Sequence, residues 1–513
     1  MSICNRLITI VFAGGGFCGV LSAQAGGSGQ QQTRAQQVSL SGRQAQQSGT
    51  VGVQQSTTGG AGSSVDVSTT NVQVQGAYSG SVPAASQPSG NSITLDQALQ
   101  MGLRYNLGAV GSSASLRQTR GQRLAALSQL LPTLNGSVSE TGAKTDLQTL
   151  GLSSSAFGGG IPLPTTVGPY HYYDARVTLN YNVLDFTARH NYIAAKEAEA
   201  AAELSDKDAR ELVVLAVGGE YLRLLADAAL VEAQVAQVRY AQSSYDQALA
   251  QNQAGTKSLV DTERSQVELQ TEQQRLTSQR ADLVKEKRTM ARMIGLRLDA
   301  DFVPVEKLTF TPAPPLPIDE ALKRAYMKRA DLQSAAAQLK ASEETLKAAH
   351  SEHLPSVNVN GYVAVQGINP NAGSGVFSGT ASLNVPIWQG GRIHADEEQA
   401  RAAIDQRRAE YQDQRGVVEL DVRNAFTDLE TATNQVQVAD SNRTLALRTL
   451  QQSQDRFVAG VANSVEVVQS QESLAAADRD YVSSLYSQNL AKISLARALG
   501  QAETSIPEFL KGH

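Results

Sequence analysis

Two acidic residues that follow turns are the first candidates for a chemical role. Asp261 stands three residues after Ser258, and Glu466 stands three residues after Asn463. This is the spacing of a capping box, in which the N-cap side chain and an acid at the third helical position satisfy free backbone N–H groups. We therefore expect capping to be the main role of both acids. Attraction of cations is a second role that is open to such acids where they cluster.

Residues with catalytic or metal-binding chemistry do not form a set elsewhere. His350 and His353 have helical spacing, but two ligands without a third do not make a metal site. The glycine runs at 14–16 and 158–160 do not precede a helix with the Lys-Ser/Thr of a phosphate loop. The sequence shows no nucleophile with a matching base. We therefore expect no enzyme, no metal and no cofactor.

The composition favours long helices over a compact core. The 513 residues include 44 Lys and Arg against 49 Asp and Glu, which gives no reason to expect nucleic acid as a partner. Aromatic residues make up 5% of the chain, with a single Trp, whereas a compact core needs more large apolar side chains. Coiled coils form from Ala, Leu and charged residues, which this chain has in plenty.

Residues 1–25 have the three parts of a secretory signal peptide. The apolar run after Arg6 is too short to span a bilayer comfortably, and Ala23-Gln24-Ala25 is a small-x-small cleavage site. Both cysteines of the chain lie in this segment, so a cleaved chain has none left for disulfides. The alternative is lipidation at Cys18, although the two residues before it fit a lipidation signal poorly.

Residues 26–91 are rich in Gly, Ser, Gln and Thr. Such a segment buries too little apolar surface to offset the entropy of ordering, so we expect it to be disordered. Val-x-Val pairs that begin at Val51, Val65 and Val72 hint at no more than a weak strand tendency.

From residue 92 onward the chain repeats itself, and this decides the fold. Asp96-Gln97-Ala98-Leu99 matches Asp319-Glu320-Ala321-Leu322, which lies 223 residues later. The glycine at 255 matches the glycine at 460, which lies 205 residues later. We predict a first repeat at 92–296, a linker at 297–317, a second repeat at 318–501 and a tail at 502–513. The second repeat is shorter because it lacks part of the loop that follows about residue 140.

Four segments alternate apolar and polar residues with the period of a strand. They are residues 133–140, 172–184, 356–366 and 376–387. Their polar faces carry Asn, Ser and Thr with few charges, which fits a transmembrane barrel with a wet lumen better than a soluble core. After the signal the sequence has no run of eighteen apolar residues, so membrane entry must use strands. Phe186, Trp388 and Tyr172 lie near strand ends and are candidates for interfacial aromatics.

Four strands cannot close a barrel, and open edges are not tolerated in lipid. The chain must therefore form an oligomer. A dimer would supply eight strands and a trimer twelve, and the alternation pattern does not choose between them.

Very long helices follow the second strand of each repeat. Residues 189–251 contain no proline, and a helix of that length spans on the order of 90–100 Å. Rows of spacing seven indicate coiled-coil packing. In the first repeat the rows are Val214, Tyr221, Ala228, Val235 and Leu249, and Val217, Leu224, Val231, Val238 and Tyr245; in the second they are Val422, Ala425, Leu429, Ala432, Val436 and Ala439, before a break at Arg443.

The ordered set of motifs resembles the TolC-like outer-membrane efflux protein family. It comprises the two Asp-x-Ala-Leu segments, the Leu-Pro steps before the strands, Asn384-Val385-Pro386-Ile387-Trp388, the turns at Gly255 and Gly460, and Ala498-Leu499-Gly500. The resemblance covers residues 92–500. It implies a mainly α protein with transmembrane β: a homotrimer with one twelve-stranded barrel in the outer membrane of a Gram-negative bacterium, above a long helical periplasmic barrel.

The resemblance also implies partners and tip roles. A periplasmic adaptor and an inner-membrane transporter would deliver small molecules or secreted proteins to this exit channel. Asp261 and Glu466 occupy positions where family members carry acids at the periplasmic tip, whereas Gln469 stands where a second acid is common. Gly255 and Gly460 are candidates for adaptor docking and, on their own chemistry, for left-handed helix ends.

Two classes of protein compete with this interpretation. A surface coiled-coil protein would explain export and the long helices but not four amphipathic strands at duplicated positions. A periplasmic adaptor would have one helical hairpin rather than two copies of one plan. Fractionation separates the three, because only the channel is integral to the outer membrane.

Overall fold

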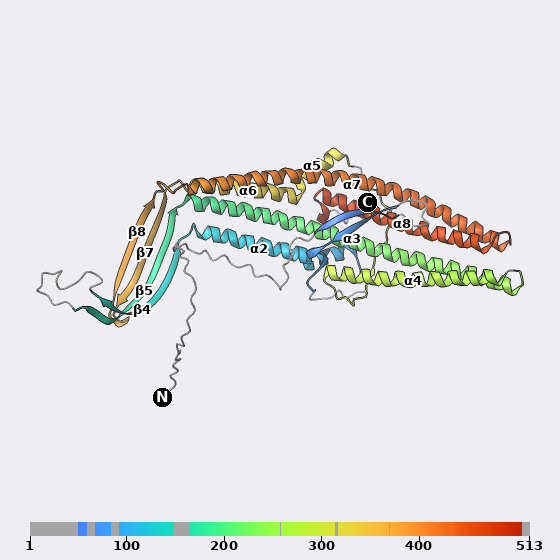
Figure 1. Cartoon of the computed structure of the whole chain (residues 1–513), viewed down its shortest axis with the longest axis horizontal. Helices are drawn as coiled ribbons and strands as arrows, with labels where there is room; N and C mark the ends of the chain where they lie inside the picture. Colours follow the sequence, from blue (N-terminus) through green and yellow to red (C-terminus); the bar gives the residue numbers. More distant parts are fainter. Residues whose placement is uncertain are drawn as a thin grey trace, which may run out of the picture. The chain divides into compact units, whose positions relative to one another are not determined.

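The computed structural model describes residues 50–58, 67–83, 92–147, 164–256, 258–312, 316–368 and 370–504. The expected signal segment at 1–25 lies outside them, as do much of 26–91 and the end of the tail. Residues 46–513 form one unit, in which the helices lie side by side and a four-stranded sheet extends from one end of them (Figure 1). No described helix is both long and apolar enough to cross a membrane.

The two repeats have the same order of helices and strands. In the first, α1 (Leu95–Tyr105) and α2 (Leu107–Ser128) precede two strands, and α3 (Phe186–Gln253) and α4 (Leu259–Ile294) follow them. In the second, α5 (Ile318–Lys328) and α6 (Ala330–Ser351) precede two strands, and α7 (Arg392–Val458) and α8 (Ser464–Ala498) follow. The prediction of one long helix per repeat is confirmed, at 68 and 67 residues. Neither helix contains an internal proline that would break it.

The sheet consists of β4 (Thr133–Asp146), β5 (Thr166–Leu184), β7 (Ser356–Gly367) and β8 (Gly373–Asn384), antiparallel and in that order. All four predicted strands are present, but four of their bounds differ by several residues: the end of β4, the start of β5 and both ends of β8. The first hairpin extends well past residue 140, because its Thr-rich strands continue to pair up to Asp146↔Thr166. The last strand ends at Asn384 instead of 387, where Pro386 has no N–H to continue a ladder.

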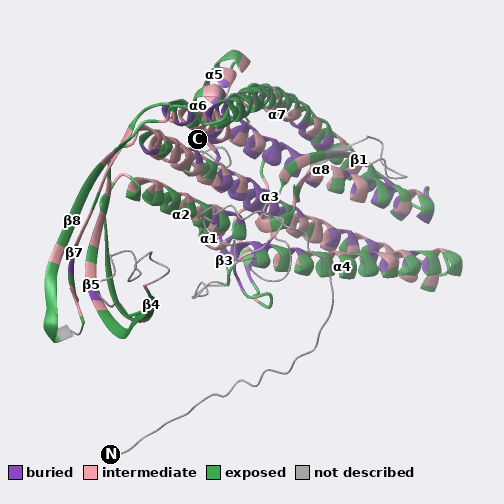
Figure 2. Ribbon diagram, turned by 60° about the vertical axis from the view of Figure 1, so that its left-hand side comes forward, coloured by how far each residue is buried: buried purple, intermediate pink, exposed green. Residues whose placement is uncertain are grey.

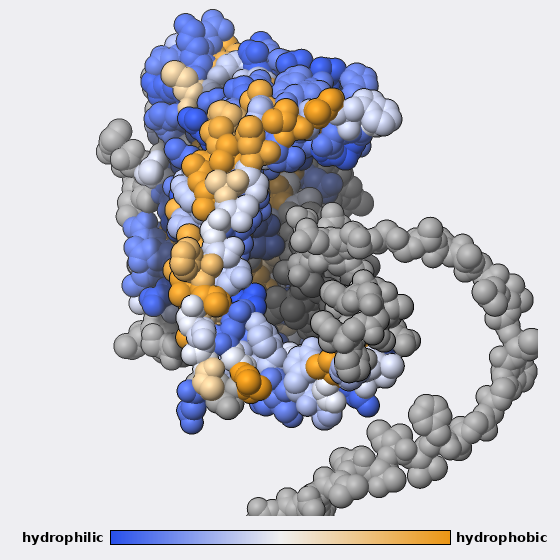
Figure 3. All heavy atoms as spheres, turned by 90° about the vertical axis from the view of Figure 1, so that its left-hand side faces the viewer, coloured by the Kyte–Doolittle hydropathy of each residue, from blue (hydrophilic) through white to orange (hydrophobic). Residues whose placement is uncertain are grey.

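The register aligns the apolar residues of all strands on one face. Val177 of β5 lies opposite Val363 of β7, and Val363 lies opposite Phe377 of β8. These side chains are open to the surroundings, with Phe377 85% exposed. Figure 3 looks onto this end of the molecule and shows hydrophobic residues gathered in a band over it. A sheet face that is apolar and exposed is suited to lipid rather than to water.

The helices form a curved layer, and their side-by-side order follows the order of the strands to which they connect. Near the sheet the neighbours run α2-α3-α6-α7, and farther from it they run α4-α3-α8-α7 (Figures 1 and 2). The layer therefore has two free edges. One is α7, against which the short helix α5 also packs, and the other is α2 continued by α4.

Helix α8 joins two buried clusters. One face of α8, with Leu490 and Ile493, packs against α3 and the end of α4. The next face, with Leu495 and Leu499, packs against α5 and α7. Figure 2 shows the buried residues concentrated where these helices meet. Two short parallel strands, β3 (Ser92–Ile93) and β6 (Val303–Pro304), close this region beside α1.

The heptad rows are confirmed on α7 and only in part on α3. All six predicted positions of α7 are buried. On α3, Val214, Val217, Tyr221 and Leu224 are buried, but beyond them the buried positions include Gln234 and Gln237 while Val235 and Val238 are only half-buried. The reason is that this part of α3 faces α4 and α8 through polar side chains, and Val238 borders an open groove.

Part of the segment expected to be disordered is ordered in the structure. β1 (Val51–Thr58) and β2 (Val67–Val74) form an antiparallel hairpin, and a 3₁₀ turn η1 (Gly76–Ser79) follows. The apolar side chains of this hairpin, such as Val72, pack on the α3–α8 cluster. The segment therefore gains its apolar burial from the helices, which its own composition could not reveal.

Candidate functional site: the helical tips and their links

The two ends of the helical hairpins are built alike. Gly255 and Gly460 have φ values of +75° and +77°, which confirms the predicted left-handed residues. The residue after each glycine closes the helix end: Thr256 N–H donates to Gln251 O at 3.0 Å and Val461 N–H donates to Arg456 O at 3.0 Å. This is a Schellman motif at both tips, and only glycine adopts it without steric cost.

The predicted capping boxes are half right. Ser258 Oγ accepts from Val260 N–H at 3.2 Å, and Asn463 Oδ1 accepts from Glu466 N–H at 3.0 Å, so both N-caps are formed. The two acids do not complete the boxes, because their carboxylates have other partners. Asp261 is bonded to the next hairpin, and Glu466 lies 3.5 Å from Arg456 Nε of α7.

Asp261 links the two hairpins at the tip. Its Oδ1 accepts a hydrogen bond from Ser464 Oγ at 2.9 Å, which joins the start of α4 to the start of α8. Arg264 Nη1 donates to the same hydroxyl at 3.3 Å and lies 3.7 Å from the carboxylate. Ser464 is only 2% exposed, so water does not replace these bonds readily.

Farther up, α3 and α8 meet along a polar seam. Gln471 Nε2 donates to Ser244 Oγ at 2.9 Å, and Gln237 Nε2 donates to Asp478 Oδ2 at 3.4 Å. Asp478 also accepts from Arg443 of α7 at 2.7 Å. The break in the heptad row at Arg443 was the sequence signal for this polar contact, but it did not reveal Asp478 as the partner.

Exposed apolar residues surround both turns. Leu259 and Val260 are about 60% exposed on one tip, and Val458 and Val461 are about as open on the other. Gln469 is exposed on α8, one turn above. Each turn therefore carries an exposed pair of apolar side chains beside its glycine.

The three candidate aromatics lie at the two ends of the sheet. Phe186 begins α3 directly after β5, and Trp388 follows β8 with 86% of its surface exposed. Tyr172 lies twelve residues before the end of β5. Twelve residues span about 40 Å along a strand, or about 30 Å across the membrane at a tilt near 40°. This separation matches a hydrocarbon core.

The opposite face of the sheet carries a polar cluster that the sequence interpretation did not single out. Asp174, 3% exposed, accepts from Arg176 Nε at 3.0 Å and from Gln366 Nε2 at 3.1 Å. The Arg176 guanidinium also lies over the Tyr362 ring, 5.0 Å from its centre. Asp174 and Arg176 therefore place their charges on the face of the sheet opposite Val177 and Val363.

The histidine pair has a structural partner. His350 Nδ1 lies 2.7 Å and His353 Nε2 lies 3.4 Å from Oε1 of Glu397, which ties α6 to α7. Arg401 Nη2 lies 3.1 Å from the other oxygen of this carboxylate. Within the described ranges, no three His, Cys, Asp or Glu side chains are arranged to hold a metal ion.

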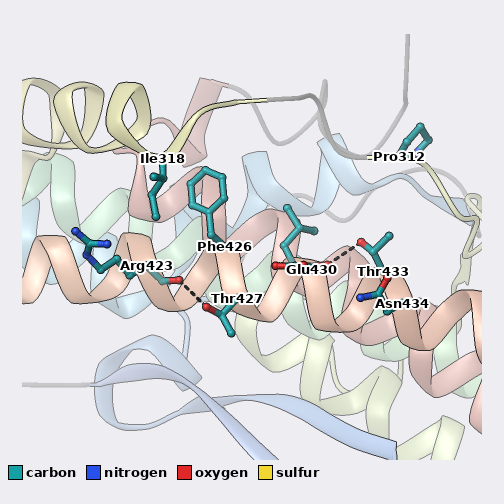
Figure 4. Close-up of a pocket in the computed structure, with 9 residues that line it drawn as sticks. Pro312, Ile318, Arg423, Phe426, Thr427, Glu430, Thr433 and Asn434 are labelled. Atoms are coloured by element: carbon teal, nitrogen blue, oxygen red, sulfur yellow. Dashed lines mark hydrogen bonds between the residues drawn. The ribbon is translucent and has the colours of Figure 1, made fainter.

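A groove on α7 has no reactive arrangement. Figure 4 shows its lining, which comes from α7, the start of α5 and Pro312. The hydroxyls of Thr427 and Thr433 donate to carbonyls of their own helix, those of Arg423 and Leu429. Apolar Phe426 and Ile318 form the rest of the wall. The groove is suited to packing rather than to catalysis.

Comparisons with known proteins agree with this architecture. The model of the outer membrane efflux protein family matches residues 111–296 and 321–501. The chain is similar to the probable outer membrane lipoprotein SilC of Salmonella typhimurium, with 23% identity over 68% of this chain and 76% of that protein. It is also similar to the toluene efflux pump outer membrane protein TtgF of Pseudomonas putida, with 23% identity over 64% of this chain and 69% of that protein.

Two solved structures share the fold. The Campylobacter jejuni CmeC outer membrane channel has a TM-score of 0.68 at 17% identity, covering 80% of this chain and 86% of that one. The Vibrio cholerae outer membrane protein VceC has a TM-score of 0.65 at 19% identity, covering 79% and 96%.

The sheet with one lipid-type face, carried on long helical hairpins, defines a channel protein of the outer membrane with a large periplasmic part, and not an enzyme. The chain belongs to the outer membrane efflux protein family.

Proposed function

We propose that this chain forms the exit channel of a tripartite efflux system, as a homotrimer that works with a periplasmic adaptor and an inner-membrane transporter. The observation that carries the proposal is the pair of free edges. β4 and β8 each pair on one side only within the described sheet, and α7 and the α2/α4 line are the matching edges of the helical layer. Placing β8 of one copy beside β4 of the next also places α7 beside α2 and α4.

Head-to-tail contacts of this kind generate a ring when the rotation between copies closes, and the curvature of the layer favours closure. Three copies would give twelve strands, and the family resemblance favours this number over the eight strands of a dimer. Exposed apolar residues on α7, among them Val417, Val438 and Leu445, lie at multiples of seven residues and would face the neighbouring copy. The charged face of the sheet, with Asp174 and Arg176, would line the lumen.

The tips would form the periplasmic entrance. In a trimer the acids Asp261 and Glu466 would each be present three times around the same axis, where they would attract cations. Gln469, in place of a second acid, would limit the charge of this ring. The turns at Gly255 and Gly460, with their exposed apolar neighbours, would be the docking surface for the adaptor.

Transport of small molecules is favoured over type I protein secretion by the relatives, one of which is named as part of a toluene efflux pump. Protein secretion remains the second candidate. The cargo itself would be selected by the transporter, because the described lumen face presents mainly small uncharged Asn, Ser and Thr side chains. Phe186, Trp388 and Tyr172 would mark the two membrane interfaces.

Two measurements test the proposal. Detergent-corrected light scattering of the particle extracted from outer membranes should give the mass of three chains. The same particle in planar bilayers should conduct ions, with a conductance that changes on substitution at the tip. A single-chain mass, or release of the protein without detergent, would contradict the proposal and favour a surface coiled-coil protein.

A further inference from the structure

The N-terminal segment 67–83, here called the strap, fits into the helices at three glycines. The first is Gly219, in the middle of α3. A methyl group at this position would overlap the side chain of Val72 in β2. The hydroxyl of Tyr486 on α8 is within hydrogen-bonding reach of the Val72 backbone. The strap therefore contacts α3 and α8 at the point where their cores join (Figures 1 and 2).

The second glycine is Gly108, at the start of α2. A side chain there would overlap the ring of Tyr78. Asn106, the fully buried residue between α1 and α2, donates from Nδ2 to Tyr78 O at 2.7 Å and to Met293 O at 3.3 Å. One amide group therefore ties the strap both to the α1/α2 junction and to the end of α4.

The third glycine is Gly295, at the end of α4, whose added Cβ would lie 2.8 Å from Val82 O. Backbone hydrogen bonds secure the same stretch. Val82 N–H donates to Tyr105 O at 2.8 Å, and Leu107 N–H donates to Gly80 O at 2.9 Å. The strap is thus built into the first repeat by side-chain contacts and backbone bonds.

The second repeat holds the equivalent junction by other means. Arg329 is the counterpart of Asn106, and its Nη1 donates to Asp421 of α7 at 2.7 Å. Asp421 corresponds to Ala216 in the first repeat, and Gly219 corresponds to Asn424 in the second. The first repeat therefore lacks an equivalent of the Arg329–Asp421 ion pair, and the second lacks an equivalent of the glycine that leaves room for Val72. The strap occupies the junction that has no ion pair of its own.

We propose that the strap is an intramolecular lock that holds the α3/α4 hairpin in place against α8. The argument rests on the proposed channel function, in which the two hairpins of each chain must separate for the tips to open. The strap spans the joint above the polar α3–α8 seam. While the strap is in place, the first-repeat hairpin cannot pivot at the α1/α2 junction without breaking either the bond from Ser81 Oγ to Arg292 O of α4 or the bonds at Val82 and Leu107 that join the strap to α1 and α2.

The test uses the full-length protein extracted from membranes. Gly219→Ala should unseat the strap, and the double variant Gly219→Ala with Val72→Ala should restore it by removing the overlapping methyl groups. Gly121→Ala is the matched control, because Gly121 is also in a helix and has open space around its Cβ position. Hydrogen exchange at the amides of Val82 and Leu107 reports on the strap, and conductance in planar bilayers reports on opening.

In Gly219→Ala, exchange at both amides should be faster by about tenfold or more, and closed-state conductance should rise several-fold. The double variant and Gly121→Ala should match the wild type in both readouts. Unchanged exchange in Gly219→Ala, or fast exchange with wild-type conductance, would overturn the proposal while leaving the channel function intact. A wild-type protein that does not conduct would instead count against the channel function, and the exchange data would still decide whether the strap is locked.

Discussion

The Asp261 carboxylate and the Ser464 hydroxyl, which belong to different helical hairpins, are joined by a 2.9 Å hydrogen bond at the tips. The bond is positioned by two separate N-caps and is shielded by the burial of Ser464. It is the link between the hairpins that lies nearest to the turns. Any outward movement of one hairpin past the other must break it.

Ser464→Ala should therefore make tip opening easier. Removal of the hydroxyl leaves the carboxylate with Arg264 alone and should lower the free energy of opening by about 1 kcal/mol, the net contribution of a typical hydrogen bond. Single-channel recording should show a several-fold higher open probability. Ser473→Ala is the control, because its hydroxyl donates only to Gln469 O within α8. Equal gating in both variants would show that the link does not restrain the tip.

Glu466→Gln should change the interaction of the tip with cations. The substitution removes one negative charge per chain and the 3.5 Å ion pair with Arg456, while the N-cap bond from Asn463 to the backbone remains. Divalent cation block from the periplasmic side should weaken by about threefold to tenfold. Glu472→Gln, an exposed acid on the same helix, should leave block unchanged. Conductance and block that stay at wild-type values in Glu466→Gln would remove this acid from the entrance.

The lipid-facing assignment of the sheet can be tested with neighbouring residues of β8. Phe377→Arg places a charge on the apolar face opposite Val363, near the middle of the strands, and should destabilise the barrel by about 2–4 kcal/mol. Ser378→Arg places the same charge on the polar face and should be tolerated. Heat-modifiable gel mobility of the particle extracted from membranes measures the difference. Equal stability of the two variants would contradict the assignment.

The sequence predicted the order of elements because its signals are local. Period-two alternation predicted the four strands, and proline-free heptads predicted both long helices. Glycines predicted the left-handed turns at Gly255 and Gly460. Each of these signals acts within a few residues. The duplication added a check, because a match such as Asp96 with Asp319 fixes equivalent places in two repeats.

Long-range partners could not be predicted in the same way. Nothing near Asp261 in the sequence points to Ser464, 203 residues away, so the capping box was the natural but incomplete interpretation. The same holds for the order seen in the N-terminal hairpin. The polar composition of the hairpin predicts disorder, whereas Gly219, far along the chain, leaves room for Val72 of the hairpin against α3.

A buried pair of carboxyl groups should make stability depend on pH. Glu220 of α3 and Glu286 of α4 are each 8% exposed, and Arg223 and Asp227 of α3, Asp282 of α4 and Tyr486 of α8 are the charged and titratable groups around them. Burial raises the pKa of Glu220 well above its ordinary value, and so does the hydrogen bond that its protonated form donates to Glu286. Arg223 Nε, 3.4 Å from Glu286, offsets only part of this.

A carboxyl group whose folded-state pKa is raised contributes stability that is fully present below its unfolded pKa, near 4.5, and is lost as the pH rises through the folded value. Glu220→Gln keeps the shape and cannot ionise, so it should match the wild type at pH 4.5 and be more stable by roughly 1–3 kcal/mol at pH 8. Thermal unfolding followed by circular dichroism across this range measures the difference. Glu263→Gln, at an exposed acid on α4, is the control for the loss of one carboxylate from this helix. If the stability gained by Glu220→Gln did not vary with pH, Glu220 would already be ionised in the folded protein, and Arg223 would be compensating the charges of both carboxylates.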